Sequence, residues 1–249
     1  AHYMMGGIRV NHEGASVGGD DEGSVKYGIS GLFAAGQAMG GLFGANRLGS
    51  TSLTELAVFG SRAGVAAAKN SLNNSFKVNK KLFESYINEY SSLFGQKGSI
   101  ASNILRDDIQ KESWKKIGPV RTAKGIKEME DKIKEIEAKL NNISIPNYFI
   151  WNQAFMDFVE LKNMICSAKL IGLAAKERNG SIGGHVRLDA KNISIFSRPY
   201  STVVHKNNST YLVKKLNRTR TPLKNLIYYK ILEKKRLLEA RFLSMLPKN

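Results

Sequence analysis

The sequence predicts an α+β protein of 249 residues in three parts. Fifteen of its 23 glycines lie at or before Gly64, helical periodicity dominates the middle of the chain, and positive charge concentrates at its end. We therefore expect strands, loops and one long helix over 1–72, an antiparallel helical bundle over 73–190, and a small basic α+β tail with short strands and a terminal helix over 191–249.

The long helix of the first part is expected to begin near Ser52. Ser52 and Glu55 have the spacing of a capping box, and small apolar residues then recur at three- and four-residue steps. Gly60 and Gly64 indicate close packing on a sheet, because glycine otherwise destabilises a helix interior. The start of this helix suits an anion beside Arg47, and an ordinary capped core helix is the alternative. The apolar face comprises Leu53, Leu56, Ala57, Gly60, Ala63, Gly64, Ala67 and Ala68.

The middle of the chain has the periodicity of packed helices. Residues 70–75 read as a polar linker, and Pro146 favours an antiparallel turn between the last two helices. The aromatic and methionine stripes of this part predict a core rather than a cofactor site. The three faces are Phe83, Tyr86, Ile87, Tyr90, Leu93 and Phe94; Ile126, Met129, Ile133, Ile136 and Leu140; and Phe155, Phe158, Val159, Leu161, Met164, Ile165, Ala168 and Ile171.

The tail carries most of the net charge of +17. Residues 191–249 hold 14 basic and two acidic side chains, a net charge of +12. Short β-like runs occur over 193–211, including 200–204, and a basic helix is expected over 223–246. Such a helix suits an anionic membrane surface, an acidic partner subunit or, least of all, nucleic acid. A solvated lysine-rich face is the alternative that implies no partner.

Composition excludes several kinds of site from this chain. Cys166 is the only cysteine, which rules out an internal disulfide and a cysteine-ligated iron–sulfur cluster and fits a reducing compartment. Residues 27–46 are uncharged, but six of them are glycine, so we expect strand and loop rather than a membrane span. No Gly-x-Gly-x-x-Gly follows an apolar strand, so we expect no dinucleotide phosphate site within the chain.

Several motifs in order resemble one family. They are His-Tyr-Met-Met-Gly-Gly-Ile at 2–8, Gly-Leu-Phe-Ala-Ala-Gly-Gln at 31–37, Gly-Ala-Asn-Arg-Leu-Gly-Ser at 44–50 and Val-Phe-Gly-Ser-Arg-Ala-Gly at 58–64, followed by segments at 116–122, 151–152 and 161–164. Over about residues 1–190 the chain resembles the C-terminal part of the flavoprotein subunit of succinate dehydrogenase and fumarate reductase. L-aspartate oxidase shares two of the motifs, but the residues after Gly-Ala-Asn-Arg and the Val-Phe-Gly segment favour the dicarboxylate oxidoreductases.

The resemblance implies roles for five residues. His2 and Arg47 match the residues that bind the carboxylates of succinate or fumarate, and an arginine fork suits a carboxylate bidentately. Ser52 and Leu53 match residues whose backbone N–H groups meet the flavin, where a helix dipole stabilises negative charge. Gln37 stands where the family usually has a glutamate that bonds FAD. The catalytic arginine of the family is expected upstream, so no catalytic residue is assigned to this chain.

The chain also departs from the family pattern. Phe43 replaces a common histidine before Gly-Ala-Asn-Arg, which removes a polar group near the site. Residues 180–189 resemble the family's Glu-Ser-Arg-Gly-Ala-His-x-Arg-x-Asp segment but have Gly180 and Ile182 at its first glutamate and first arginine. His185 of this segment, like His12 and His205, is interpreted as a surface or structural residue.

By resemblance, the chain is predicted to be part of an FAD-dependent flavoprotein that interconverts succinate and fumarate by hydride transfer with flavin. The expected partners are the dicarboxylate, a missing N-terminal flavoprotein portion and an iron–sulfur subunit that carries the electrons onward. The expected location is the cytoplasm, peripheral to the membrane if the basic tail touches it. The alternatives are an L-aspartate oxidase-like flavoenzyme and a non-catalytic assembly fragment that cannot bind FAD alone.

Overall fold

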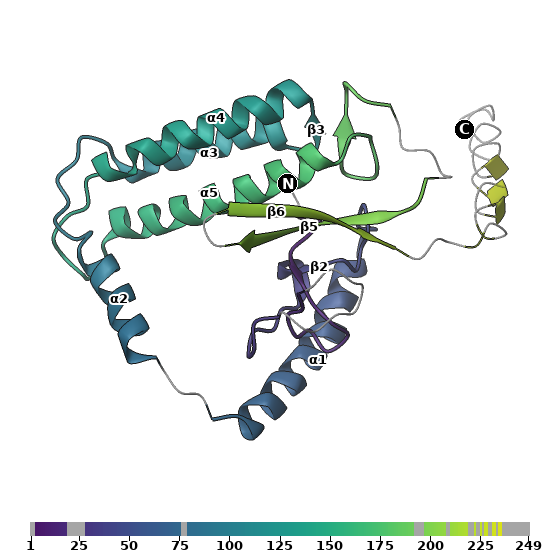
Figure 1. Cartoon of the computed structure of the whole chain (residues 1–249), viewed down its shortest axis with the longest axis horizontal. Coiled ribbons are helices and arrows are strands. Elements are labelled where there is room, and N and C mark those ends of the chain that lie inside the picture. Colours follow the sequence, from purple (N-terminus) through teal and green to yellow (C-terminus); the bar gives the residue numbers. More distant parts are fainter. Residues whose placement is uncertain are drawn as a thin grey trace, which may run out of the picture.

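The computed structural model has the predicted α+β composition and is mostly helical, with three two-stranded sheets among the residues that it describes (Figure 1). It describes residues 3–18, 28–75, 79–191, 197–207 and 210–218. In the C-terminal segment it further describes 222, 225, 227, 228, 231, 232, 234 and 235.

The first part consists of short strands and one long helix. Strand β1 (Ile8–Arg9) pairs in parallel with β2 (Met39–Gly40), and a 3-10 turn, η1 (Gly36–Ala38), precedes β2. The expectation of strand and loop rather than a membrane span is confirmed for residues 28–46. Across the described parts of the chain, no helix is long and apolar enough to cross a membrane.

Helix α1 (Thr51–Asn73) corrects three expectations. The helix runs on to Asn73, so the linker predicted at 70–75 is wrong over its first four residues. The capping box is also wrong, because Ser50 is the N-cap residue and its side chain makes no capping bond. The expected sheet packing is absent among the described residues: Leu53 is 72% exposed, and a Cβ at Gly60 or Gly64 would meet nothing within 4 Å.

The core lies in a bundle of three helices, α3 (Ser102–Ile117), α4 (Ala123–Lys139) and α5 (Gln153–Glu177). The predicted stripes of α4 and α5 are confirmed, since they supply most of the buried side chains. Helix α3 was not predicted, and it adds Leu105, Ile109 and Ile117 to the same core. The buried side chains from α4 and α5 are Ile126, Met129, Ile133, Ile136, Phe158, Leu161, Ile165, Ala168 and Ala175.

Helix α2 (Lys80–Ser91) forms where the periodicity predicts a helix, but its face is only partly buried. Tyr90 packs edge-to-face on Phe155 of α5, with ring centroids 6.1 Å apart. Phe83, Tyr86 and Ile87 are instead 58%, 53% and 47% exposed, so the prediction of a core stripe is wrong for these three. Among the described residues of α2, only those at the end nearest the bundle pack against another element.

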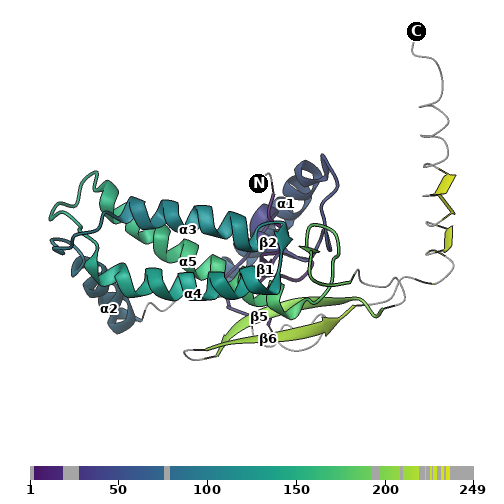
Figure 2. The same ribbon diagram turned by 90° about the horizontal axis from the view of Figure 1, so that it is seen from above.

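Two further sheets connect the later parts of the chain. Strands β3 (Val120–Arg121) and β4 (Val186–Arg187) pair in parallel, and the 3-10 turn η2 (Leu140–Asn142) follows α4. Strands β5 (Tyr200–Asn207) and β6 (Thr210–Asn217) form an antiparallel hairpin beside the bundle (Figure 2). The hairpin confirms the β-like run at 200–204, whereas 193–196 lie outside the described residues.

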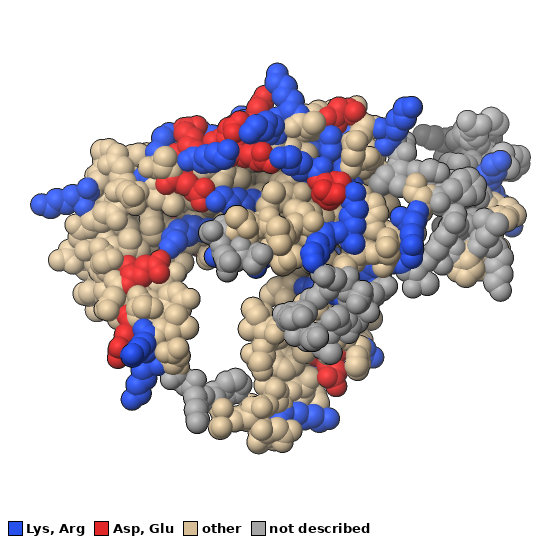
Figure 3. All heavy atoms as spheres, in the orientation of Figure 1, with Lys and Arg blue, Asp and Glu red and all other residues tan. Residues whose placement is uncertain are grey.

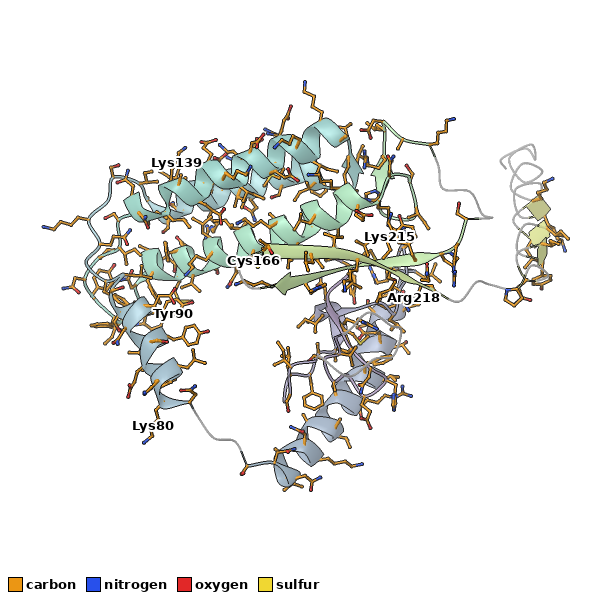
Figure 4. All side chains as sticks on the ribbon, viewed as in Figure 1. Lys80, Tyr90, Lys139, Cys166, Lys215 and Arg218 are labelled. Carbon is orange, nitrogen blue, oxygen red and sulfur yellow. The ribbon has the colours of Figure 1, made fainter. Side chains whose placement is uncertain are left out.

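Contacts along the hairpin join it to α5, and the residue that follows the hairpin lies close to the first part of the chain. Lys215 of β6 pairs with Glu177 at the end of α5 (2.7 Å), and Tyr211 lies 3.7 Å from the Cys166 sulfur. A Cβ at Gly41, just after β2, would lie 3.3 Å from Arg218. Figure 4 labels Cys166, Lys215 and Arg218, which lie along the way from α5 toward the first part of the chain.

The outer surface of the bundle is charged with both signs. Lys and Arg alternate with Asp and Glu over α3 and α4 in the space-filling view (Figure 3). Lys132 of α4 pairs with Asp108 of α3 (2.8 Å), and Lys176 of α5 pairs with Glu130 of α4 (2.8 Å). Of the predicted tail helix at 223–246, the positions described are helical: 225, 227, 228, 231, 232, 234 and 235.

Candidate functional site

Arg47 is held in place by two neighbours at the N-terminal end of α1. Its Nη1 donates a hydrogen bond to the Ser52 hydroxyl oxygen at 2.8 Å, and its guanidinium carbon lies 4.8 Å from the centre of the Tyr3 ring. The face of an aromatic ring attracts a cation, so both contacts restrain the side chain. The arrangement leaves further guanidinium N–H groups for an anionic ligand.

The aromatic neighbours of Arg47 form a small cluster. Tyr3 meets Phe43 edge-to-face, with ring centroids 5.6 Å apart and planes at 88°. Phe43 therefore supports the ring under Arg47. Burial and the nearby Glu55 carboxylate raise the pKa of Tyr3 above its usual value, and the Arg47 guanidinium opposes them. Tyr3 accordingly stays a neutral phenol at physiological pH.

Ser52 and Leu53 lie in the first turn of α1. Ser50, the N-cap residue, has a left-handed φ of +66°, and its side chain accepts no bond from the helix. Thr51 donates through its hydroxyl to the Leu48 carbonyl at 2.8 Å, which closes the loop before the helix. The first N–H groups of a helix have no partner within it, and the dipole favours negative charge there. Arg47 thus adds a side-chain cation to a helix end that already favours anions.

Gln37 is exposed, in a turn that α1 holds through a buried glutamate. The Oε1 of Glu55 accepts a hydrogen bond from the Gly36 N–H at 2.7 Å, and Glu55 is only 3% exposed. Its Oε2 is buried with no hydrogen-bond partner in the structure. A buried carboxylate with a free oxygen is costly unless another donor reaches it. Sequence reasoning placed Glu55 in a capping box, and no local signal distinguishes that role from this one.

Of the five predicted site residues, the structure brings Arg47 and Ser52 into contact and places Leu53 beside them. The turn that contains Gln37 is bonded to α1, because Glu55 of α1 accepts a hydrogen bond from the Gly36 N–H. His2 lies outside the described residues. Tyr3, which sequence reasoning did not single out, supplies the surface on which Arg47 stacks.

The segment at 180–189 also reaches this site. The Gly184 N–H donates to the carbonyl of Ala45, in the loop of Arg47, at 3.0 Å. His185 behind it is 8% exposed and accepts a hydrogen bond from Arg121. Its interpretation as a structural residue agrees with these contacts.

Two family models match the chain. One, described as the fumarate reductase flavoprotein C-terminal region, matches residues 106–238, which is more than half of the chain. The other, an FAD-binding domain, matches residues 1–53. The chain belongs to the succinate dehydrogenase/fumarate reductase flavoprotein family and corresponds to its C-terminal portion. This family binds FAD, and the chain carries the end of the FAD-binding domain.

Curated relatives of this flavoprotein chain support the same assignment. One is the flavoprotein subunit of the 8-methylmenaquinol:fumarate reductase of Wolinella succinogenes, which is 32% identical over 195 residues, covering 76% of this chain and 30% of the relative. Another is the succinate dehydrogenase flavoprotein subunit of Rickettsia bellii, which is 31% identical over 194 residues, covering 76% and 32%. The chain therefore spans about a third of the length of these relatives.

Solved structures of similar flavoproteins have the same fold. FrdA of the E. coli quinol fumarate reductase superposes with a TM-score of 0.77 at 26% identity, covering 89% of this chain and 38% of that one. Sdh1 of Mycobacterium smegmatis gives a TM-score of 0.71 at 25% identity, covering 88% and 36%.

Proposed function

We propose that this chain is part of an FAD-dependent flavoprotein that interconverts succinate and fumarate, with Arg47 binding a substrate carboxylate. The observation that carries the proposal is the restrained Arg47 at the start of α1, held by Ser52 and Tyr3. A planar guanidinium binds a carboxylate with two parallel hydrogen bonds, which a lysine would not reproduce. Fixing the guanidinium in advance lowers the cost of orienting the dicarboxylate for reaction.

The described residues fit FAD at two places. The buried Oε2 of Glu55 is an unpartnered acceptor next to the turn of Gln37, which suits a hydroxyl or N–H donor of a bound ligand. The first turn of α1 presents the backbone N–H groups of Ser52 and Leu53, which suit the pyrimidine edge of a flavin. When bound, FAD supplies the two-electron chemistry that the side chains of this chain lack.

The roles of the chain's own residues follow from this geometry. Arg47 holds one carboxylate, and we propose His2 as a ligand of the same substrate on the strength of the motif at residues 2–8. Ser52 and Tyr3 keep the guanidinium from rotating away when no substrate is present. The proton-transferring arginine is proposed to come from another portion of the flavoprotein.

We further propose that another portion of the flavoprotein covers α1. Leu53, Leu56 and Val65 are 72%, 49% and 53% exposed along this helix, and the chain spans about a third of its relatives. An opening between α2 and α1, walled mainly by uncharged residues, is visible in Figure 3. Apolar surface of this extent ordinarily packs against protein. The division at 1–72, 73–190 and 191–249 belongs to the same proposal.

Electron transfer away from the site is proposed to use a separate iron–sulfur subunit. The single cysteine, Cys166, provides too few thiolates for a cluster within this chain. Several relatives are named as flavoprotein subunits, which supports a multisubunit assembly. A cytoplasmic location, and a membrane-surface contact through the basic tail, stay predictions from composition.

The direct test is substitution of Arg47 in the assembled flavoprotein. Arg47→Ala is expected to lower kcat/KM for succinate and fumarate by about 100-fold, which corresponds to ~2.7 kcal/mol. Arg47→Lys should recover only part of the loss, because a lysine cannot form the two-bonded fork. Arg62→Ala is the matched control: Arg62 is an exposed arginine of α1, with its guanidinium carbon 5.4 Å from the centre of the Phe59 ring, and its removal should leave kcat/KM within about twofold.

Flavin absorbance, measured with the mass of every species present, separates the remaining alternatives. Flavin retained with normal dicarboxylate turnover in Arg47→Ala would overturn the carboxylate role. Turnover of L-aspartate in place of succinate would identify the aspartate oxidase alternative. A colourless protein that assembles with its partners would identify a non-catalytic assembly fragment.

A further inference from the structure

A tight turn from the C-terminal part of the chain touches the loop that carries Arg47. The turn spans Ile182–His185 and is closed by two backbone hydrogen bonds, from the Ile182 N–H to the His185 carbonyl (2.9 Å) and from the His185 N–H to the Ile182 carbonyl (3.0 Å). At its tip, the Gly184 N–H donates to the carbonyl of Ala45 at 3.0 Å. Ala45 is two residues before Arg47, so the bond acts on the backbone that positions the guanidinium.

The tip of the turn has no room for a side chain at Gly183. Gly183 has a φ of +55°, and a Cβ there would lie 2.3 Å from the Ala45 carbonyl oxygen. Such an overlap forces one of the two backbones to move. At the neighbouring Gly184 a Cβ would come no closer than 3.7 Å to another atom, the Asn46 Oδ1, which is ordinary contact. The close approach therefore depends on glycine at position 183 alone.

Arg121 braces the turn from the helical bundle. Its Nη1 donates to Nδ1 of His185 at 2.5 Å, and its Nε donates to the carbonyl of Ile117, the last residue of α3, at 3.1 Å. A guanidinium can only donate, so Nδ1 of His185 accepts and the ring proton is on Nε2, which donates to the Arg178 carbonyl at 3.1 Å. His185 is thus held from two sides in one tautomer.

The strand that follows the turn is fastened to the same place. The Val186 N–H donates to the Pro119 carbonyl and the Leu188 N–H to the Arg121 carbonyl, each at 3.0 Å. Arg187 pairs with both oxygens of Asp189 at 2.8 and 3.1 Å. The Asp189 carboxylate also accepts the first N–H of α4, from Ala123, at 2.6 Å. These bonds tie the turn to the junction of α3 and α4, and both helices contribute side chains to the bundle core.

We propose that the Ile182–His185 turn, braced by Arg121, is a positioning element that fixes the Ala45–Arg47 backbone and so sets where Arg47 presents its guanidinium. The structure shows hydrogen bonds that link α3 to Arg121 and Arg121 to His185, and the adjacent Gly184 N–H then donates to the Ala45 carbonyl. Tight binding of a carboxylate requires the Arg47 guanidinium to lie within a fraction of an ångström of its productive position. A shift of this loop therefore weakens substrate binding. The link to substrate rests on the proposed dicarboxylate role of Arg47.

The test uses three glycine variants of the assembled flavoprotein. Gly183→Ala introduces the overlap with Ala45. Gly184→Ala is the control within the turn. Gly98→Ala is the remote control, because its Cβ, in the loop before α3, would meet the Asn142 carbonyl of η2 at 2.2 Å, a similar overlap away from the site. Amide hydrogen exchange over residues 44–50 measures how firmly the loop is held. The Kd of malonate, a dicarboxylate whose single CH2 group cannot be desaturated, measures binding at the site.

Gly183→Ala is expected to speed exchange over 44–50 and to raise the malonate Kd, each about tenfold. Both controls should leave both readouts within about twofold. The proposal would be overturned if amide exchange over 44–50 were no faster in Gly183→Ala than in Gly98→Ala. Faster exchange with an unchanged malonate Kd would uphold the positioning of the loop and count against Arg47 as the carboxylate ligand, which separates the two proposals.

A second pair of variants covers the case in which Gly183→Ala does not assemble. Arg121→Leu removes the donor to His185 without touching the loop of Arg47, and Arg121→Lys restores one donor. Exchange over 44–50 should rise in Arg121→Leu and fall back in part in Arg121→Lys. Equal exchange in wild type and Arg121→Leu, with the bundle intact, would contradict the bracing role.

Discussion

The α3–α5 bundle and the α1 region bury their apolar side chains in different ways. In the bundle, Ile109, Ile136 and Leu161 are fully buried by side chains of this chain alone. On α1, only Glu55 and Ala63 are buried, and most of the larger apolar residues are exposed, although Phe59 is half-buried. The bundle is therefore stabilised by its own core, whereas the region of the candidate site leaves apolar surface exposed in this chain. Site geometry in α1 is held by hydrogen bonds and by the 182–185 turn rather than by a core.

The largest expected effect is the loss of stability when a core side chain of the bundle is truncated. Leu161→Ala should lower the free energy of unfolding by about 2–5 kcal/mol, because it removes buried contacts and leaves a cavity. Leu53→Ala, on the exposed face of α1, should change it by less than about 0.5 kcal/mol in this chain alone. Urea unfolding followed by circular dichroism measures both. If Leu53→Ala lowered the free energy of unfolding as much as Leu161→Ala does, α1 would already be covered, and the two regions would not differ in this respect.

A smaller effect is expected at Glu55, where the α1 region carries a buried carboxylate. Glu55→Gln keeps an acceptor for the Gly36 N–H and replaces a buried carboxylate, whose Oε2 has no partner, with a neutral amide, so this chain by itself should be stabilised by about 1 kcal/mol. In the assembled flavoprotein the same change should weaken FAD retention, if a ligand donor bonds Oε2. Glu84→Gln, on α2, controls for net charge. Destabilisation of the isolated chain by Glu55→Gln would show that Oε2 has a partner.

The smallest effect concerns pH at the contact between the two regions. Burial, followed by the guanidinium groups of Arg121, Arg178 and Arg187, lowers the pKa of His185. Folded His185 therefore stays neutral while the unfolded chain takes up a proton below about pH 6.5. The free energy of unfolding should fall as pH drops below that value, until His185 protonates in the folded state. His185→Gln should flatten this dependence, whereas His12→Gln, at an exposed position, should not. Equal slopes in wild type and His185→Gln would contradict the burial of a neutral imidazole.

Much of the bundle was predictable from local pattern. The apolar spacing in α4 and α5 identifies buried residues such as Ile133 and Ile165, and in α4 the apolar face lies opposite a charged one. Helix α3 escaped prediction since its apolar residues do not form one face: Leu105 and Ile109 are buried, but Ile104 and Trp114 are 61% and 60% exposed. The hairpin residues Tyr200 to Val204 were recognisable from their β-branched and aromatic content.

The candidate site was predictable in part. The motif around Arg47 and the helix that begins beside it predict an anion-binding position, which stays a prediction, and the structure shows that Arg47 contacts Ser52. Glu55 was misassigned, because its spacing from Ser52 satisfies a capping box whether or not the side chain turns elsewhere. The contact between Gly184 and Ala45 joins residues 139 positions apart, and no local rule anticipates such a pair.

The sequence by itself determined the family, the order of its motifs, the helices of the bundle that carry a clear apolar stripe, and the basic character of the tail. Only the tertiary structure decided that Glu55 is buried, that the apolar face of α1 is open in this chain, and that the 182–185 turn meets the loop of Arg47. The physical reason is that periodicity shows which face of an element is apolar but not what covers it. Contacts between distant segments depend on the packing of every element between them.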